Sequence, residues 1–134
     1  MAAIAATRAG AILAVADVAA ATAWYRDHLG FAVEATFEDP AYAILSLAGA
    51  RLSLAEQGHP AEDRPGVELE APSDPARLQA NLVIEVGDCR GAYAELREQG
   101  VRFLTEPFLP PWGGARVFAV DLDGYLVELE ELAK

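Results

Sequence analysis

The chain has few of the residues that build cross-links and metal centres. Its 134 residues include one cysteine, Cys89, and two histidines, His28 and His59. A single cysteine excludes an intramolecular disulfide. No CxxC pair or Cys/His cluster of the kind that binds zinc is present in the sequence.

Long hydrophobic runs are also missing, and no leader sequence is expected. The longest charge-free stretch near the N-terminus, Ala9–Ala16, is far too short to span a bilayer. The segment Met1–Ala6 is apolar, but no basic residue precedes it, so we do not expect a secretion signal. We therefore expect a cytoplasmic protein.

Positive charge is scarce. There are 10 Lys and Arg residues against 21 Asp and Glu residues, which gives a formal charge of −11. Such a surface repels phosphate backbones and anionic membranes, so neither nucleic acid nor a membrane is an expected partner. It would attract a cationic small molecule; the alternative is an acidic face that only keeps the protein in solution. A hydrophobic fraction of 53% indicates a globular chain with a real core.

The most informative feature is an internal repeat. An apolar run that ends in an aspartate and leads into a helix-like segment occurs twice, at 11–28 and at 82–99. The two aspartates, Asp17 and Asp88, are 71 positions apart. A duplicated unit of this kind cannot bury its sheet face alone, so we expect two copies that enclose a shared cleft.

Each copy is predicted to be a βαβββ module. Strands are expected at 11–15, 31–37, 42–47 and 51–55, with a helix at 18–28; the second set comprises strands near 81–86, 101–105, 116–121 and 125–130, with a helix at 89–99. The run 11–15 is wholly apolar, which is typical of a strand covered on both faces. Asp17 is expected to cap its helix and Gly30 to end it.

The predicted fold class is therefore α+β, with two tandem βαβββ modules that form a curved, mostly antiparallel sheet around a cleft. Within one domain, 1–134, the first module spans 8–56, a linker spans 57–79 and the second module spans 80–134. Four prolines lie in the linker, which we expect to be a loop with a short extended piece at 67–70.

Three motifs carry a family resemblance: Val15-Ala-Asp17 leading into Ala23–Phe31, Pro111-Trp-Gly113 followed by Arg116-Val-Phe118, and Asp121-Leu-Asp-Gly-Tyr-Leu-Val-Glu-Leu129. With them the chain resembles the vicinal oxygen chelate superfamily, which contains glyoxalase I, extradiol dioxygenases and the bleomycin-resistance proteins. The resemblance covers nearly the whole chain.

In metal-using members of that family, four side chains on the inner face of the sheet hold a divalent ion. The resemblance and strand alternation give Gly10, Ser53, Asn81 and Glu128 as the equivalent positions. Only Glu128 is a serviceable ligand for a transition metal. His28 is expected to interact with its helix and His59 to be solvated. We therefore expect no metal and no other cofactor.

The metal-free branch that the chain most resembles is the bleomycin-resistance type, small acidic homodimers that sequester a drug without breaking a bond. Trp112, Phe37 and Tyr42 would be stacking walls. Glu128 would pair with a cationic group of the ligand, and Arg116 would bind a carboxylate or pair with a nearby acid.

The expected ligand-binding residues are Phe37, Tyr42, Ser53, Asn81, Trp112, Arg116 and Glu128. Ordinary packing is the alternative for the aromatic residues, and a leftover of an ancestral metal site is the alternative for Asn81 and Glu128.

Two enzymatic alternatives stay open at this stage. One is a metal-dependent lyase or oxygenase with an atypical site that uses Glu128 and a ligand such as His59. The other is a metal-free enzyme with Glu128 as general base, for which the sequence offers no partner acid or nucleophile.

Overall fold

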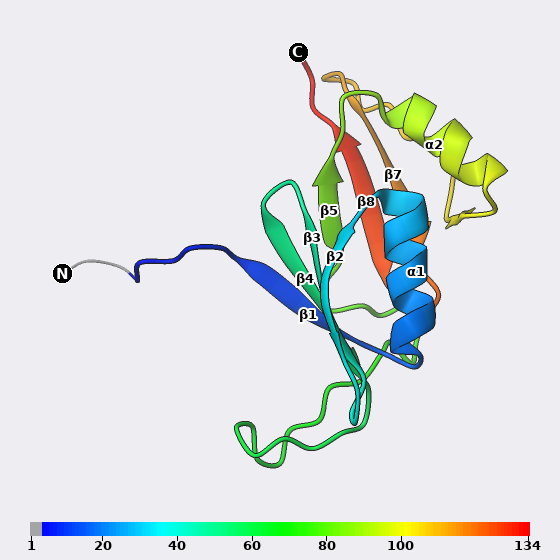
Figure 1. The fold of residues 1–134 in the computed structure, drawn as a ribbon. Helices are drawn as coiled ribbons and strands as arrows, with labels where there is room; N and C mark the ends of the chain where they lie inside the picture. The colour runs from blue at the N-terminus through cyan, green and yellow to red at the C-terminus, as the bar shows by residue number, and fades with distance from the viewer. Residues whose placement is uncertain (1–3) are drawn as a thin grey trace. The chain divides into compact units, whose positions relative to one another are not determined.

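The computed structural model describes residues 4–134. The chain forms two compact units, Met1–Ala71 and Pro72–Lys134, and both have the element order strand, helix and three strands (Figure 1). The predicted α+β class with two tandem βαβββ modules is therefore confirmed. Residues 1–3 of the segment Met1–Ala6, for which no secretion signal is expected, lie outside the described residues.

The first unit contains five elements: β1 (Gly10–Val15), α1 (Val18–Leu29), β2 (Ala32–Phe37), β3 (Tyr42–Leu47) and β4 (Ala50–Glu56). Its strands lie in the order β1-β4-β3-β2, with β1 parallel to β4 and the other pairs antiparallel. Ala48 and Gly49 both have positive φ, 52° and 84°, which is the requirement of the tight hairpin turn predicted between β3 and β4.

The second unit repeats this arrangement with β5 (Leu82–Glu85), α2 (Cys89–Glu98), β6 (Arg102–Phe103), β7 (Ala115–Val120) and β8 (Leu126–Glu131). Its strand order is β5-β8-β7-β6, and β5 is parallel to β8. The turn before β8 is held by Asp121, whose Oδ1 accepts hydrogen bonds from the backbone N–H groups of Asp123 and Tyr125, both at 2.9 Å.

Equivalent aspartates begin the two helices. The Oδ1 atom of Asp17 accepts a hydrogen bond from the N–H of Ala20 at 3.0 Å, and Oδ1 of Asp88 accepts one from Gly91 at 2.9 Å. These bonds satisfy a helix N–H group that has no partner within the helix. Gly30 ends α1 with a left-handed φ of 79°. The predicted capping residues are therefore confirmed.

Each sheet has one face covered by its own helix. In the first unit the buried side chains of Leu52 and Leu54 on β4 lie on the side of α1, where Tyr25 is also fully buried. In the second unit Val117 and Leu129 hold the same place beneath α2. Because side chains alternate along a strand, the intervening residues point to the other face. We call these other faces the first-unit face and the second-unit face.

Two expectations about the strands are wrong. β1 is an edge strand, and Ile12 in it is 51% exposed, so it is not covered on both faces. β6 has two residues rather than five, because the chain leaves the sheet ahead of Pro107 and Pro110. In the linker, the piece 67–70 joins no sheet, and the N–H of Gly58 donates to the carbonyl of Leu69 at 3.1 Å.

No helix within residues 4–134 combines the length and the apolar character needed to cross a membrane.

Candidate functional site

Strand register determines which side chains meet on the first-unit face. Gly10 on β1 and Ser46 on β3 flank Arg51 on β4, and Ile12 and Ile44 flank Ser53 in the same way. Residues opposite one another on neighbouring strands share a face. The predicted site residue Ser53 therefore lies beside Arg51, which the sequence analysis did not single out.

Arg51 is held in place by two neutral oxygens. Its Nε donates to Oγ of the fully buried Ser53 at 2.9 Å, and its Nη2 donates to Oη of Tyr42 at 3.0 Å. None of the ion pairs within residues 4–134 includes Arg51. We call Arg51, Ser53 and Tyr42 the arginine frame. It fixes the direction of a charged group while leaving its charge uncompensated by a contacting carboxylate.

A second arginine neutralises the acid on this face. The guanidinium of Arg8 grips both carboxylate oxygens of Glu34, with Nη2 and Oε1 3.0 Å apart. The hydrogen bond from Arg8, a further one from Ser46 and the charge of Arg51 lower the pKa of Glu34 to about 2. Because β1 and β2 are opposite edges of the sheet, the Arg8 side chain must cross β4 and β3 to reach Glu34.

Two predicted aromatic residues meet at the other end of the face. Phe37 and Tyr42 are paired across β2 and β3, with ring centroids 6.1 Å apart and planes tilted by 46°. Phe37 is 53% exposed. The structure therefore brings together three of the seven predicted site residues, Phe37, Tyr42 and Ser53, around an arginine that was not predicted.

The second-unit face is mainly acidic. Glu128 lies between Val83 on β5 and Phe118 on β7, and Glu130 lies between Glu85 and Arg116. The Cζ atom of Arg116 lies 5.3 Å from the centroid of the Phe108 ring. The predicted residues Glu128 and Arg116 thus share a face.

Asn81 and Trp112 lie outside the strands of this unit. Asn81 directly precedes β5, and alternation gives it the same side as Val83. Trp112 is 70% exposed on the loop before β7, where the N–H of Gly113 donates to the carbonyl of Pro110 at 3.0 Å. Gly114 has a φ of 78°, and a Cβ there would collide with the carbonyl of Glu131. These glycines are required by the tight turn.

The residues present do not fit the chelate of the metal-using relatives. A Cβ atom at Gly10 would collide with the backbone carbonyl of Arg51, so no ligating side chain fits there without a shift of the backbone. The hydroxyl of Ser53 accepts from a guanidinium, which repels a divalent cation. Within residues 4–134, no cluster of three or more His, Cys, Asp and Glu side chains is suited to hold a metal ion.

The histidines have other partners. Nε2 of His59 lies 3.3 Å from Oε2 of Glu56 in an exposed pair, so His59 is not merely solvated as expected. The ring of His28 lies edge-on to Trp24, with centroids 5.5 Å apart, which agrees with a structural role in α1.

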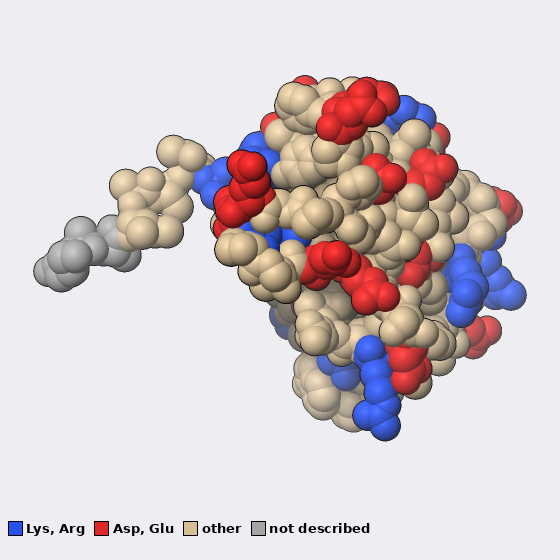
Figure 2. All heavy atoms as spheres, turned by 90° about the horizontal axis from the view of Figure 1, so that it is seen from below, with Lys and Arg blue, Asp and Glu red and all other residues tan. Residues whose placement is uncertain are grey.

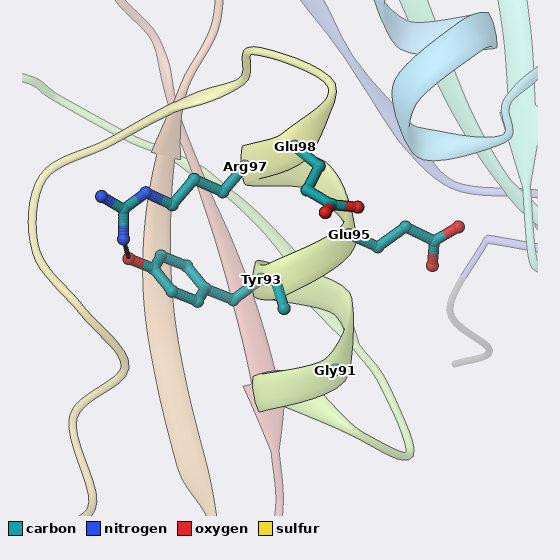
Figure 3. A pocket seen from close by; sticks show the side chains of 6 residues that line it. Gly91, Tyr93, Glu95, Arg97 and Glu98 are labelled. Atoms are coloured by element: carbon teal, nitrogen blue, oxygen red, sulfur yellow. Dashed lines mark hydrogen bonds between the residues drawn. The ribbon is translucent and has the colours of Figure 1, made fainter.

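A hollow that the sequence did not predict runs along α2 (Figure 3). It has a volume of about 700 Å³ and is lined by side chains of α2, among them Tyr93, Glu95 and Arg97. Nη1 of Arg97 donates to Oη of Tyr93 at 3.0 Å, a bond between successive turns of one helix. None of the seven predicted residues lines this hollow, and its polar groups come from a single helix, so we do not consider it the candidate site.

Charge on the surface is mixed. In the space-filling view, Asp and Glu side chains lie in several small groups, some of them beside Lys or Arg side chains (Figure 2). The excess of acid over base in the whole sequence therefore does not determine the charge at any one site.

Comparison with known proteins gives a family match and similar folds. The family model described as Glyoxalase/Bleomycin resistance protein/Dioxygenase superfamily matches residues 5–129. No curated protein matches the chain.

Solved structures with a similar fold include a glyoxalase/bleomycin resistance protein/dioxygenase from Nocardioides, 19% identical, covering 100% of this chain and 87% of that one, with a TM-score of 0.78. TioX from Micromonospora sp. ML1 is 18% identical over 94% of this chain and 98% of its own, with a TM-score of 0.75. TnmS3, an antibiotic binding protein from Streptomyces sp. CB03234, is 22% identical over 99% of this chain and 100% of its own, with a TM-score of 0.69. At these identities the likeness shows the fold alone.

Proposed function

The chain belongs to the Glyoxalase/Bleomycin resistance protein/Dioxygenase superfamily, and within it we propose that it is a metal-free, non-enzymatic binder that sequesters a cationic or aromatic small molecule. The ligand would lie against a sheet face that the helix of the same unit leaves uncovered. The branch that we propose for it is the bleomycin-resistance-like type. We propose further that the protein acts as a cytoplasmic homodimer.

One observation carries this proposal: the half-exposed ring pair of Phe37 and Tyr42 adjoins the arginine frame. Binding pockets for small molecules combine apolar and aromatic walls with a few fixed polar groups. Exposed rings are costly in water unless something covers them. A flat aromatic ligand would cover this pair and gain stacking in addition to the burial of apolar area.

Sequestration is favoured over metal-dependent catalysis by the donor set. A metal would polarise or activate a substrate oxygen in the lyase and dioxygenase reactions of the family. Two of the positions equivalent to the family's metal ligands are Gly10 and Ser53. Gly10 has no side chain, and the hydroxyl of Ser53 already accepts a hydrogen bond from Arg51. The fold is also similar to that of TnmS3, an antibiotic binding protein.

In the second unit, Glu128 would anchor a cationic group of the ligand, with Asn81 as a further polar contact. Glu130 and Glu85 lie on the same face and add to its negative charge. Trp112 would supply an additional stacking surface, and Arg116 would bind an acceptor group.

A ligand screen tests the proposal. Thermal shift would be measured with aromatic and glycopeptide antibiotics, in EDTA and with added Zn²⁺, Ni²⁺, Mn²⁺ or Fe²⁺. We expect a saturable ligand that raises Tm equally in EDTA. Stoichiometric metal in protein purified without added metal, or binding that requires metal, would overturn it.

Variants locate the site of any ligand found. Phe37→Ala and Trp112→Ala should each weaken binding by about tenfold through lost ring contact. Leu122→Ala removes an equally exposed apolar side chain from the turn before β8 and serves as the control. Equal affinities for all three variants would contradict the assigned faces.

A further inference from the structure

We infer that the first-unit face selects aromatic carboxylates, with Arg51 as the residue that determines this specificity. The inference rests on the proposed function, because it names the class of ligand for that site. It is opposite in sign to the expectation drawn from the formal charge of −11, which favours cations everywhere on the protein.

The first step of the argument is that Arg51 is fixed and still has donors to offer. A guanidinium carries five N–H donors in a planar fork, and the frame uses one at Nε and one at Nη2. Both acceptors, Ser53 and Tyr42, are neutral, so neither cancels the charge. The remaining N–H groups at the Nη atoms form the edge that binds a carboxylate through two parallel hydrogen bonds.

The second step concerns the local charge. Glu34 is the acid that acts electrostatically with Arg51, and both of its oxygens are already held by Arg8. Arg8, Glu34 and Arg51 together leave one positive charge on this face. A ligand carboxylate would restore neutrality there, whereas a ligand ammonium group would add a second uncompensated charge in a partly buried place.

The third step is that one side chain joins the charge to the rings. Tyr42 accepts from Arg51 through Oη and pairs with Phe37 through its ring. A ligand ring lying on this pair would therefore bring a substituent of that ring to the guanidinium. The two requirements together, a flat ring and an acidic oxygen attached to it, describe an aromatic carboxylate.

A matched series of ligands tests this inference. The dissociation constants of 2-naphthoate, 2-naphthamide and 2-naphthylmethylammonium would be measured by isothermal titration calorimetry at pH 7 and low salt. We expect the carboxylate to bind about tenfold more tightly than the neutral amide, since a charge-assisted bidentate contact replaces a neutral one, and the ammonium to bind most weakly.

Variants assign the preference to Arg51. Arg51→Gln should reduce naphthoate affinity about tenfold and leave the amide unchanged, whereas Arg51→Lys, which keeps the charge but loses the fork, should retain part of the preference. Arg77→Gln changes the net charge equally at a side chain that is 87% exposed, and it should have no effect. Tyr42→Phe removes one acceptor of the frame and should give an intermediate loss.

The outcomes separate this inference from the proposed function. Equal binding of the three compounds, or equal behaviour of Arg51→Gln and Arg77→Gln, overturns the inference and leaves an aromatic binder. If no naphthyl probe binds but an antibiotic does, the aromatic-carboxylate inference fails and the proposed function stands. If neither kind of compound binds, the inference and the proposed function both fail. Should Arg51→Gln not fold, the Arg51 Nε–H resonance of the wild-type chain must shift on addition of naphthoate and not of the amide.

Discussion

In both units an aspartate begins the helix, a helix packs on one side of four strands, and the first strand lies parallel to the last. On the opposite sheet faces the two copies have little in common. The first-unit face holds the arginine frame and the Phe37–Tyr42 pair, whereas the second-unit face holds Glu128, Glu130 and Glu85 with Arg116. Caps and core positions are retained in both copies because each fold depends on them, while the faces have been free to diverge.

The largest expected effect concerns the cores, where the copies use different side chains. Tyr25 of α1 is fully buried, with Trp24 and Phe31 against it at centroid distances of 4.9 and 5.5 Å, and α2 buries Leu96 instead. Tyr25→Ala should lower the free energy of unfolding by about 3–5 kcal/mol and Leu96→Ala by about 2–4 kcal/mol, because both leave cavities. Urea unfolding followed by circular dichroism measures this. A smaller loss for Tyr25→Ala than for Leu96→Ala would show that burial of an aromatic ring does not determine which core contributes more to stability.

The next effect distinguishes the first strands. Gly10→Ala should destabilise the protein by about 1–3 kcal/mol, since its methyl group collides with the carbonyl of Arg51. Asn81→Ala, at the equivalent position of the second unit, trims an exposed side chain and should cost less than about 0.5 kcal/mol. Urea unfolding followed by circular dichroism measures the free energy of unfolding of both variants. Equal stability of the two variants would mean that β1 moves freely against β4.

The helix caps should respond alike. Asp17→Ala and Asp88→Ala each remove one hydrogen bond to a helix N–H group and should each cost about 1 kcal/mol in the free energy of unfolding. Asp17→Asn and Asp88→Asn keep an acceptor oxygen and serve as controls. A difference of several-fold between the two alanine variants would show that capping is not equivalent in the repeat.

The smallest effect is a pH dependence confined to the first-unit face. The pKa of Glu34 lies at about 2 in the folded protein, against an ordinary 4.5, because Arg8 binds its carboxylate. A lowered pKa stabilises the fold above the ordinary value, and that contribution is lost as the pH falls from about 4.5 towards 2. Arg8→Gln should raise this pKa towards its ordinary value, as measured by carbon NMR of the carboxyl group. An unchanged pKa would mean that Arg8 does not hold Glu34 in solution.

Local signals were enough to predict most of the fold. Asp17, Gly30 and Asp88 marked the helix ends because capping depends on a residue and its nearest neighbours along the chain. The exposure of Ile12 and the shortness of β6 depend on which strands become edges, which is a property of the assembled sheet.

The candidate site was predictable only in part. Ser53 and Glu128 lie on the first-unit and second-unit faces, and the aromatic positions Phe37 and Tyr42 meet. Arg51 was missed, although it stands two residues before Ser53 and so on the same face. Its importance depends on the reach of a long side chain back to Tyr42, which follows from the pairing of β3 with β4 and not from spacing in the chain.

The close approach of Gly10 to β4 also bears on how this copy could evolve. A substitution that placed a histidine or glutamate at this position would first have to displace one strand past another. Every such intermediate would fold less well before it gained a ligand for any ion. Backbone geometry thereby opposes a metal ligand at this position of the first unit, and selection can act more readily on what its sheet face binds.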